Sequence, residues 1–228
     1  MTRYMAITAA CFLVTAPDGR AADDGEELAP VLKKAAGWEN YRFTVESRPG
    51  PGTQGALEGR YQKGRPLACK ADGIEFFKQG EALVYLDGGR WLRSKRGTVS
   101  DPLRVLGGVA KVNAVRLPHE EAATLAKVVR SVKKAERKEG GHTVFSGDLD
   151  AEAARSLVGT EHRAVARGGT ARFWVNGDGA LVKYTVDVRV QGRIGGAEVD
   201  GNIVRTVTLT GAGDTKVEVP EAARKALE

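Results

Sequence analysis

The sequence predicts an α+β protein built on a strongly curved, mostly antiparallel β-sheet, an unclosed half-barrel with short helices covering its concave face. Five apolar residues between Val182 and Val190 alternate with polar ones, which is the period of a strand and excludes a helix. Short alternating segments recur about every ten residues between 55 and 95, as in an antiparallel meander. Segments with helical spacing are few and short, so the sheet dominates the fold.

The first half of the mature chain predicts one helix followed by strands. Residues 25–36 form the helix, because their apolar residues fall at positions i, i+3, i+4 and i+7. The alternating segment 41–46 then begins the sheet. Glycine and charged residues separate the next strands and are typical of hairpin turns. We expect these strands at 55–62, 65–71, 74–78, 82–87 and 90–95.

The middle of the chain predicts helices again. Asp101 and Pro102 suit the N-cap and first position of a short helix, which we expect Gly107-Gly108 to end. A longer helix begins at Pro118, and glutamates 120 and 121 favour the positive end of its dipole. Its apolar stripe consists of Leu125, Val128, Val129 and Val132.

The last third predicts a strand over 142–147, a helix from Asp150 to Leu157, and then the longest strands. We expect a strand at 180–191 to extend about 40 Å, which requires a twisted and coiled sheet. With the remaining elements, the chain has about ten strands that do not close into a barrel. These elements are a strand at 170–176, a turn at 176–179, a glycine-rich bend at 192–201, a strand at 202–210 and a final helix from Pro220 to Leu227.

Residues 1–21 are interpreted as a secretory signal peptide. Arg3 precedes an uncharged run at 6–16, and Gly19 and Ala21 supply small residues for cleavage after Ala21 or Ala22. A first core helix explains the segment less well, because the run is apolar on all sides and acidic, helix-breaking residues follow it. We therefore expect a periplasmic or secreted protein with a single domain over 22–228.

The two cysteines add little to the interpretation of the chain as an exported protein. Cys11 follows Thr8-Ala9-Ala10, but the apolar run continues past it, so lipidation of Cys11 is not expected. Cleavage removes Cys11 and leaves Cys69 without an intrachain disulfide partner. Because Cys69 lies in an alternating segment, we interpret it as a buried structural thiol and not as a reactive one.

Composition excludes several classes of protein. The chain of 228 residues is 42% hydrophobic with a formal net charge of +6, which argues against collagen and disordered chains. No apolar run reaches the roughly 20 residues of a membrane-spanning helix, so an integral membrane protein is not expected. The small excess of positive charge does not indicate nucleic acid, which an exported protein rarely meets.

No catalytic, metal or cofactor motif is present in the mature chain. His119-Glu120-Glu121 begins like a zinc-protease helix, but Ala123 stands where the second histidine is required. Phosphate loops, dinucleotide fingerprints and nucleophile elbows are absent. We therefore expect no enzyme and no cofactor, and an unrecognised hydrolase remains the second alternative function.

The order of elements resembles the periplasmic lipoprotein-carrier-like superfamily, which includes the LolA-type carrier, the sensor RseB and the LppX/LprG-type lipid carriers. The resemblance covers nearly all of residues 25–228. It rests on short, loose motifs, namely Tyr41–Val45, Gly89–Trp91, Asp101–Leu106, Thr143–Leu149, Ala171–Asn176 and Val217–Pro220.

The resemblance implies a curved sheet and helices that enclose an apolar cavity for lipid or lipoprotein acyl chains. An envelope protein that binds such a ligand without catalysis is the leading hypothesis. The alternative is a protein-interaction or stress-sensor module of the same fold with a filled core, whose partner is another envelope protein. Large apolar side chains are the candidates for the cavity lining, although each could simply fill the core. They are Tyr41, Phe43, Tyr61, Phe76, Tyr85, Trp91, Trp174 and Tyr184.

Overall fold

The computed structural model describes residues 24–48, 54–94, 103–135, 138–158, 163–194 and 197–228. The signal peptide predicted over 1–21, Cys11 and the helix start predicted at Asp101-Pro102 lie outside these residues. The described strands form one antiparallel sheet of eleven strands in the order β6-β5-β4-β3-β2-β1-β11-β10-β9-β8-β7. Pairing of β1 with β11 joins the N-terminal meander to the C-terminal one.

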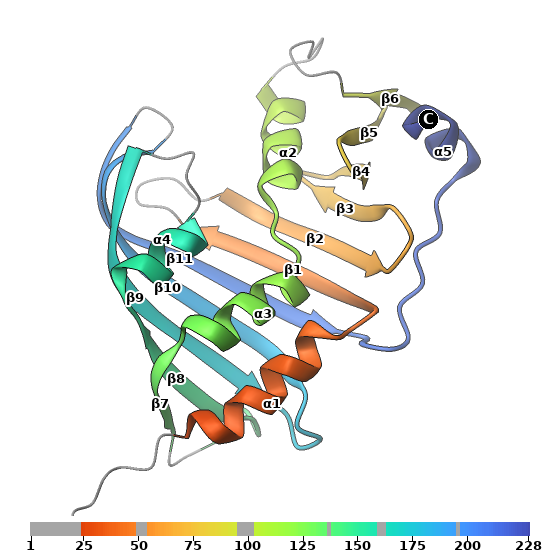
Figure 1. The fold of residues 1–228 in the computed structure, drawn as a ribbon. Helices are drawn as coiled ribbons and strands as arrows, with labels where there is room; N and C mark the ends of the chain where they lie inside the picture. The colour runs from red at the N-terminus through yellow and green to blue at the C-terminus, as the bar shows by residue number, and fades with distance from the viewer. Residues whose placement is uncertain (1–23, 49–53, 95–102, 136–137, 159–162, 195–196) are drawn as a thin grey trace, which may run out of the picture.

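The sheet curves strongly and stays open, with β6 at one edge and β7 at the other (Figure 1). This confirms the predicted α+β half-barrel. The strands are β1 (Asn40–Arg48), β2 (Gln54–Gln62), β3 (Leu67–Ala71), β4 (Ile74–Gln79), β5 (Ala82–Asp87), β6 (Arg90–Arg93), β7 (Arg130–Lys134), β8 (Thr143–Leu149), β9 (Arg163–Val175), β10 (Leu181–Ile194) and β11 (Ala197–Thr210).

Four helices lie on the concave side of the sheet. Figure 1 shows α1 and α3 running side by side across that face, with α4 beside β9 and α2 near β3 and β4. The fifth helix, α5, packs near β4, β5 and β6 at the other end of the molecule. The helices are α1 (Gly25–Ala36), α2 (Leu103–Ala114), α3 (Pro118–Val128), α4 (Ala151–Val158) and α5 (Glu221–Leu227).

The buried side chains form two apolar clusters on opposite faces of the sheet. The larger cluster lies between the concave face and the helices, and includes Leu28 and Leu32 of α1 and Val186 and Val188 of β10. The smaller cluster lies on the outer face under α5, around Phe77 of β4. Because side chains alternate along a strand, each strand can contribute to one cluster while presenting polar residues on its other face.

Helix α2 does not end at Gly107-Gly108 as predicted from the sequence, but continues to Ala114. A Cβ atom on Gly108 would lie 2.6 Å from the Phe76 ring. The glycine therefore lets the helix approach the sheet closely, and this packing outweighs the modest helical cost of glycine.

The predicted continuation of the second helix through Val132 is also wrong. Helix α3 ends at Val128, and Arg130–Lys134 forms the edge strand β7, the eleventh strand, which the sequence reading missed. The backbone N–H of Asp24 donates to the Val132 carbonyl, and the Asp24 carboxylate accepts from the Lys134 N–H at 2.6 Å. These contacts with the start of α1 make a strand at 130–134 more favourable than a further helical turn.

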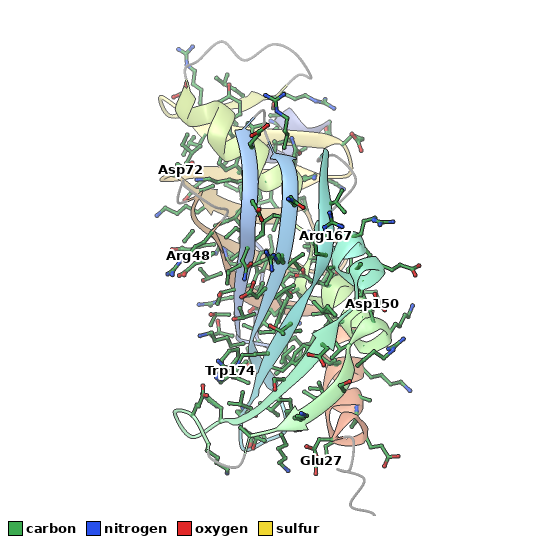
Figure 2. All side chains as sticks on the ribbon, turned by 90° about the vertical axis from the view of Figure 1, so that its left-hand side faces the viewer. Glu27, Arg48, Asp72, Asp150, Arg167 and Trp174 are labelled. Atoms are coloured by element: carbon green, nitrogen blue, oxygen red, sulfur yellow. The ribbon has the colours of Figure 1, made fainter. Side chains whose placement is uncertain are left out.

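The long C-terminal strands extend further than the sequence indicated. Strand β9 begins at Arg163 and not near residue 170. Gly168 and Gly169, which precede the predicted strand, lie within β9 beside a bulge opposite β10. The predicted glycine-rich bend at 192–201 is mostly strand, with Gly192 paired to Val199. Figure 2 faces the outer side of these strands, which run along much of the molecule.

The described helices include none that combines the length and apolar character needed to cross a bilayer.

Candidate functional site

Six of the eight predicted lining residues lie together on the concave side of the sheet. Five of these six side chains are almost fully buried in the larger apolar cluster, and Tyr61 packs against it half-buried. Tyr41 forms tilted ring pairs with Phe43 and with Tyr61, the latter with centroids 5.2 Å apart, and Phe76 forms one with Tyr85. That they line a ligand cavity stays a prediction. The six are Tyr41, Phe43, Tyr61, Phe76, Tyr85 and Tyr184.

The two tryptophans of the predicted set lie elsewhere. Trp91 packs against Phe77 in the smaller cluster beneath α5, with ring centroids 5.2 Å apart. Trp174 lies on the outer face of β9, where its Nε1 donates to Glu139 and Lys183 lies 4.6 Å from its ring centroid (Figure 2). Neither tryptophan faces the space between the concave face and the helices.

A polar cluster connects α3 to the sheet within this apolar surrounding. The backbone of α3 lies close to that of α1, and its connections to the sheet are made by side chains. Glu121 of α3 is only 2% exposed. Its Oε2 accepts a hydrogen bond of 2.6 Å from the hydroxyl of Tyr184 and lies 3.2 Å from Nη2 of Arg205. We call Glu121, Tyr184 and Arg205 the α3 latch.

Arg205 extends the latch to the segment before α3. Its Nη2 also donates to the carbonyl oxygen of Arg116 at 3.1 Å. Its Nε atom is buried and has no hydrogen-bond partner among the described residues. One guanidinium therefore holds the Glu121 carboxylate and the backbone that leads into α3, at the cost of one unpaired buried donor.

A second connection joins the first turn of α3 to β1. The hydroxyl of Tyr41 lies 2.7 Å from Nδ1 of His119, and the His119 backbone N–H donates to the same hydroxyl oxygen at 3.4 Å. The amide occupies one lone pair of the hydroxyl oxygen, and the direction of the hydrogen bond to Nδ1 depends on the His119 tautomer. The ring also stacks on Tyr61, with centroids 4.6 Å apart.

Burial shifts the pKa values of these groups in a consistent direction. Loss of hydration lowers the pKa of His119, and the nearby negative charge of Glu120 opposes that shift only in part. Burial also raises the pKa of Tyr41, and burial together with the Glu121 charge raises that of Tyr184. Both phenols therefore stay protonated and can donate to their partners on α3.

The folded protein is expected to lose stability as the pH falls below about 6.5, the ordinary pKa of histidine. The pKa of His119 is lower in the folded state, so the unfolded chain takes up this proton first and folding becomes less favourable. Urea unfolding of the wild type and His119→Gln at pH 7.5, 6.5 and 5.5 measures this. The wild type should show the steeper decline, and equal declines would exclude His119 as the cause.

The sequence reading missed Glu121 and Arg205 as interior residues. Glu121 was assigned to the helix dipole, yet it lies four positions before Leu125 and seven before Val128, in phase with the apolar stripe. Arg205 lies on the same face of β11 as Ile203, Val207 and Leu209, all of which are buried or half-buried. On both elements, a charged residue stands where the pattern calls for an apolar one. This shared feature was the signal that could have predicted the pairing of Glu121 with Arg205.

A small hollow lies beside the latch, between the end of α2 and strands β1, β2 and β11. It measures about 70 Å³, and Leu57, Val115, Lys111 and Arg205 are among the residues that line it. This volume has room for a few water molecules and none for an acyl chain. Among the described residues, Glu121 and Tyr184 of the latch are almost fully buried, which indicates close packing around them.

The remaining candidates for chemistry are inert or dispersed. Burial raises the pKa of the Cys69 thiol to about 12, so Cys69 is a poor nucleophile at neutral pH. Among the described residues, no group of three or more His, Cys, Asp or Glu side chains is arranged to hold a metal ion. Asp178 lies in the turn after Asn176, whose Oδ1 accepts from the Asp178 N–H.

Comparison with known proteins identifies the fold. No family model matches the sequence, and no curated protein matches it closely. The structure of LprF from Mycobacterium bovis superposes with a TM-score of 0.56 and 13% identity over 87% of this chain and 96% of that one. Lipoprotein LppX from Mycobacterium tuberculosis superposes with a TM-score of 0.50 and 14% identity, covering 86% and 96%.

A LolA superfamily protein from Nitrosomonas europaea aligns over 87% of this chain and 96% of its own, with a TM-score of 0.29 and 10% identity. The two mycobacterial structures, with TM-scores of 0.56 and 0.50, share the fold of this chain. With them, the fold expected from the order of elements is confirmed: the chain has the fold of LprF and of lipoprotein LppX.

Proposed function

We propose that this is an exported cell-envelope protein that binds acyl chains of a lipid or lipoprotein between the concave face of its sheet and helix α3, without catalysis. One observation carries the proposal. The concave face of an open, curved sheet is apolar, and it is covered by a helix that is attached to the sheet by side chains and not by close backbone packing.

Uptake of a chain requires α3 to move, because the described side chains on the face behind it, such as Tyr41 and Tyr184, are almost fully buried. The links that resist this motion are the α3 latch and the Tyr41–His119 hydrogen bond, which together contribute roughly 2–4 kcal/mol. A buried acyl chain contributes about 0.8 kcal/mol for each methylene, or about 8 kcal/mol for ten. The gain from burying a chain therefore exceeds the cost of breaking these polar links, and the acyl chain would replace the apolar contacts of Ala122 and Leu125 in the larger cluster.

Two further features support the proposal. The signal peptide predicted at 1–21 supports a location in the periplasm or outside the cell, where a carried lipid would have to cross an aqueous space. The fold is also that of LprF and of the lipoprotein LppX. The function itself rests on the apolar concave face, since similarity at this level of identity establishes the fold alone.

Native mass spectrometry of the full chain purified from its own host tests the proposal directly. We expect a co-purified mass of a lipid, and saturable binding of a fluorescent fatty acid after delipidation. Tyr184→Phe removes one latch hydrogen bond and should accelerate uptake of this probe several-fold. Tyr85→Phe, the same loss of a hydroxyl on the same face but away from α3, is the matched control.

A filled-core interaction module is the second candidate, and the close packing around the latch favours it. A clean apo mass together with no binding of the fluorescent fatty acid would support that module and contradict lipid binding. Equal uptake rates in the wild type, Tyr184→Phe and Tyr85→Phe would leave lipid binding intact but contradict the role of α3 as the moving element.

A further inference from the structure

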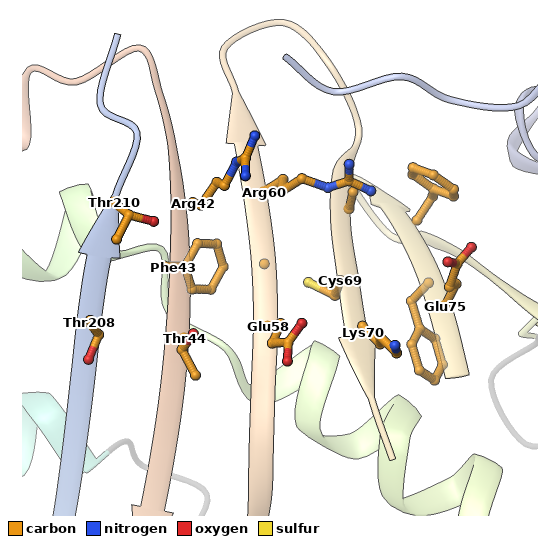
Figure 3. Close-up of a pocket in the computed structure, with 14 residues that line it drawn as sticks. Arg42, Phe43, Thr44, Glu58, Arg60, Cys69, Lys70, Glu75, Thr208 and Thr210 are labelled. Carbon is orange, nitrogen blue, oxygen red and sulfur yellow. The ribbon is translucent and has the colours of Figure 1, made fainter. Parts of the chain in front are cut away.

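The outer face of the sheet carries a hollow of its own, on the side opposite the helices that cover the concave face. It measures about 340 Å³ and spans strands β11, β1, β2, β3 and β4. Figure 3 shows it with the charged side chains of Arg42, Arg60, Glu58 and Lys70 on this face. The volume is within the range of small-molecule sites.

Strand register arranges the polar side chains of the hollow in two neighbouring rows. In one row Glu58 is paired with Lys70, and Lys70 is paired in turn with Glu75. Opposite charges alternate there, and the row carries a net charge of one negative unit. The other row runs through directly paired residues in the order Thr210, Arg42, Arg60, Ala68 and Phe77.

The second row places two positive charges directly opposite each other. Arg42 and Arg60 are cross-strand partners, and like charges in this position destabilise a sheet. Within the described part of the chain neither guanidinium forms an ion pair. In Figure 3 the Arg42 side chain reaches over β2 and that of Arg60 over β3, so both lie in the hollow.

At one end of this row neighbouring residues supply hydrogen-bond donors, and at the other end apolar residues close the hollow. Thr210 is paired with Arg42 and adds a hydroxyl, and Thr44 lines the hollow in the adjacent row. Ala68 and Phe77 are buried beneath α5 in the smaller apolar cluster. The hollow is therefore open to solvent above the two arginines and closed on the side of α5.

We propose that the Arg42–Arg60 pair is a binding site for a phosphate group of a small phosphorylated ligand. A phosphate carries close to two negative charges at neutral pH and accepts several hydrogen bonds, which suits two guanidinium groups and adjacent hydroxyls. A single carboxylate would neutralise one arginine and leave the other uncompensated. Glu58 and Glu75 border the hollow. Because their negative charges repel a broad anionic surface, the site favours a compact anionic group.

This site does not depend on the proposed lipid-binding function, because it lies on the opposite face and uses none of the latch residues. Its phosphate, a monoester in either case, could belong to a free small molecule or to the headgroup of phosphatidic acid. These sources share the chemistry that Arg42 and Arg60 recognise, and the experiment below separates them.

Thermal unfolding of the full chain at constant ionic strength, with chloride replaced stepwise by inorganic phosphate, provides the test. Phosphate should raise the Tm of the wild type and of the control Arg189→Gln, which removes an arginine from the outer face of β10. It should not raise the Tm of Arg60→Gln or Arg42→Gln. Without phosphate, Arg60→Gln should be at least as stable as the wild type, because the like-charge repulsion is gone.

Calorimetric titration with glycerol 3-phosphate should give an affinity about tenfold weaker in Arg60→Gln than in the wild type. Flotation with phosphatidylcholine vesicles that contain phosphatidic acid, compared with pure phosphatidylcholine vesicles, identifies a headgroup if binding is lost in Arg60→Gln. A response to glycerol 3-phosphate alone identifies a small ligand. Equal stabilisation by phosphate in the wild type, Arg42→Gln and Arg60→Gln would overturn the proposal.

Discussion

Replacing Glu121 with alanine is expected to destabilise the protein by about 3–5 kcal/mol. The substitution removes the acceptor of the Tyr184 hydroxyl and the counter-charge of Arg205, and both groups are left buried. Removal of one partner from a buried ion pair has this large effect because the remaining charge keeps its desolvation cost without compensation. Urea unfolding followed by circular dichroism measures the change.

A double replacement separates the cost of the unpaired groups from the value of the pair. Glu121→Leu combined with Arg205→Met removes both charges and keeps apolar volume, so it should cost far less than Glu121→Ala alone. Glu120→Ala, an exposed neighbour in the same helical turn, should cost less than about 1 kcal/mol. If Glu121→Ala and Glu120→Ala had equal effects, the latch would have no energetic role.

Variants of the latch residues also separate effects on stability from effects on ligand uptake. Variants that weaken it should lower the free energy of unfolding of the apo protein and, under the proposed function, release α3 more readily. The links from β1, β10 and β11 meet at the first turn of one helix, so a loss at any of them acts on the same moving element. Stability and uptake rate should therefore change in opposite directions across this set of variants.

Most of the fold could be predicted from the sequence because its signals are local. Alternation over 182–190 and the turn at 176–179 determine a long hairpin, and the Asn176 side chain does accept from the N–H groups that follow it. The errors arose where packing overrides local preference. Gly108 allows a helix to approach Phe76, and the contact of Asp24 with residues 132–134 turns an expected helix end into strand β7.

The candidate site was less predictable, because its residues come from distant segments. Tyr41 and Tyr184 could be recognised as inward-facing from strand alternation alone. Their partners His119 and Glu121 are 78 and 63 residues away along the chain, and only tertiary pairing shows that α3 bridges them. Trp91 and Trp174 were included on side-chain type, although their position on the outer face depends on the register of each strand with its neighbours.

Gly169→Ala is expected to be the other severe substitution, with a loss of about 3 kcal/mol or failure to fold. A Cβ atom at this position in β9 would lie 2.1 Å from the carbonyl oxygen of Asp187 and 3.0 Å from the Cα of Val188. Both atoms belong to the backbone of β10, which is hydrogen-bonded to β9 on one side and to β11 on the other. Relief of the clash requires displacement of β10, an interior strand of the sheet. The expected loss of stability is therefore at the upper end of the range for overpacking.

Two matched variants show whether the backbone clash is the cause. Gly201→Ala makes the same change in β11, where nothing lies within 4 Å of the added atom, and should alter stability by less than about 0.5 kcal/mol. Gly59→Ala in β2 collides with the Phe43 ring at 2.1 Å, so its cost should fall when Phe43→Leu is added. No side-chain replacement relieves the clash at Gly169. If Gly169→Ala were as mild as Gly201→Ala, the close approach of β9 and β10 would not be a constraint on the fold.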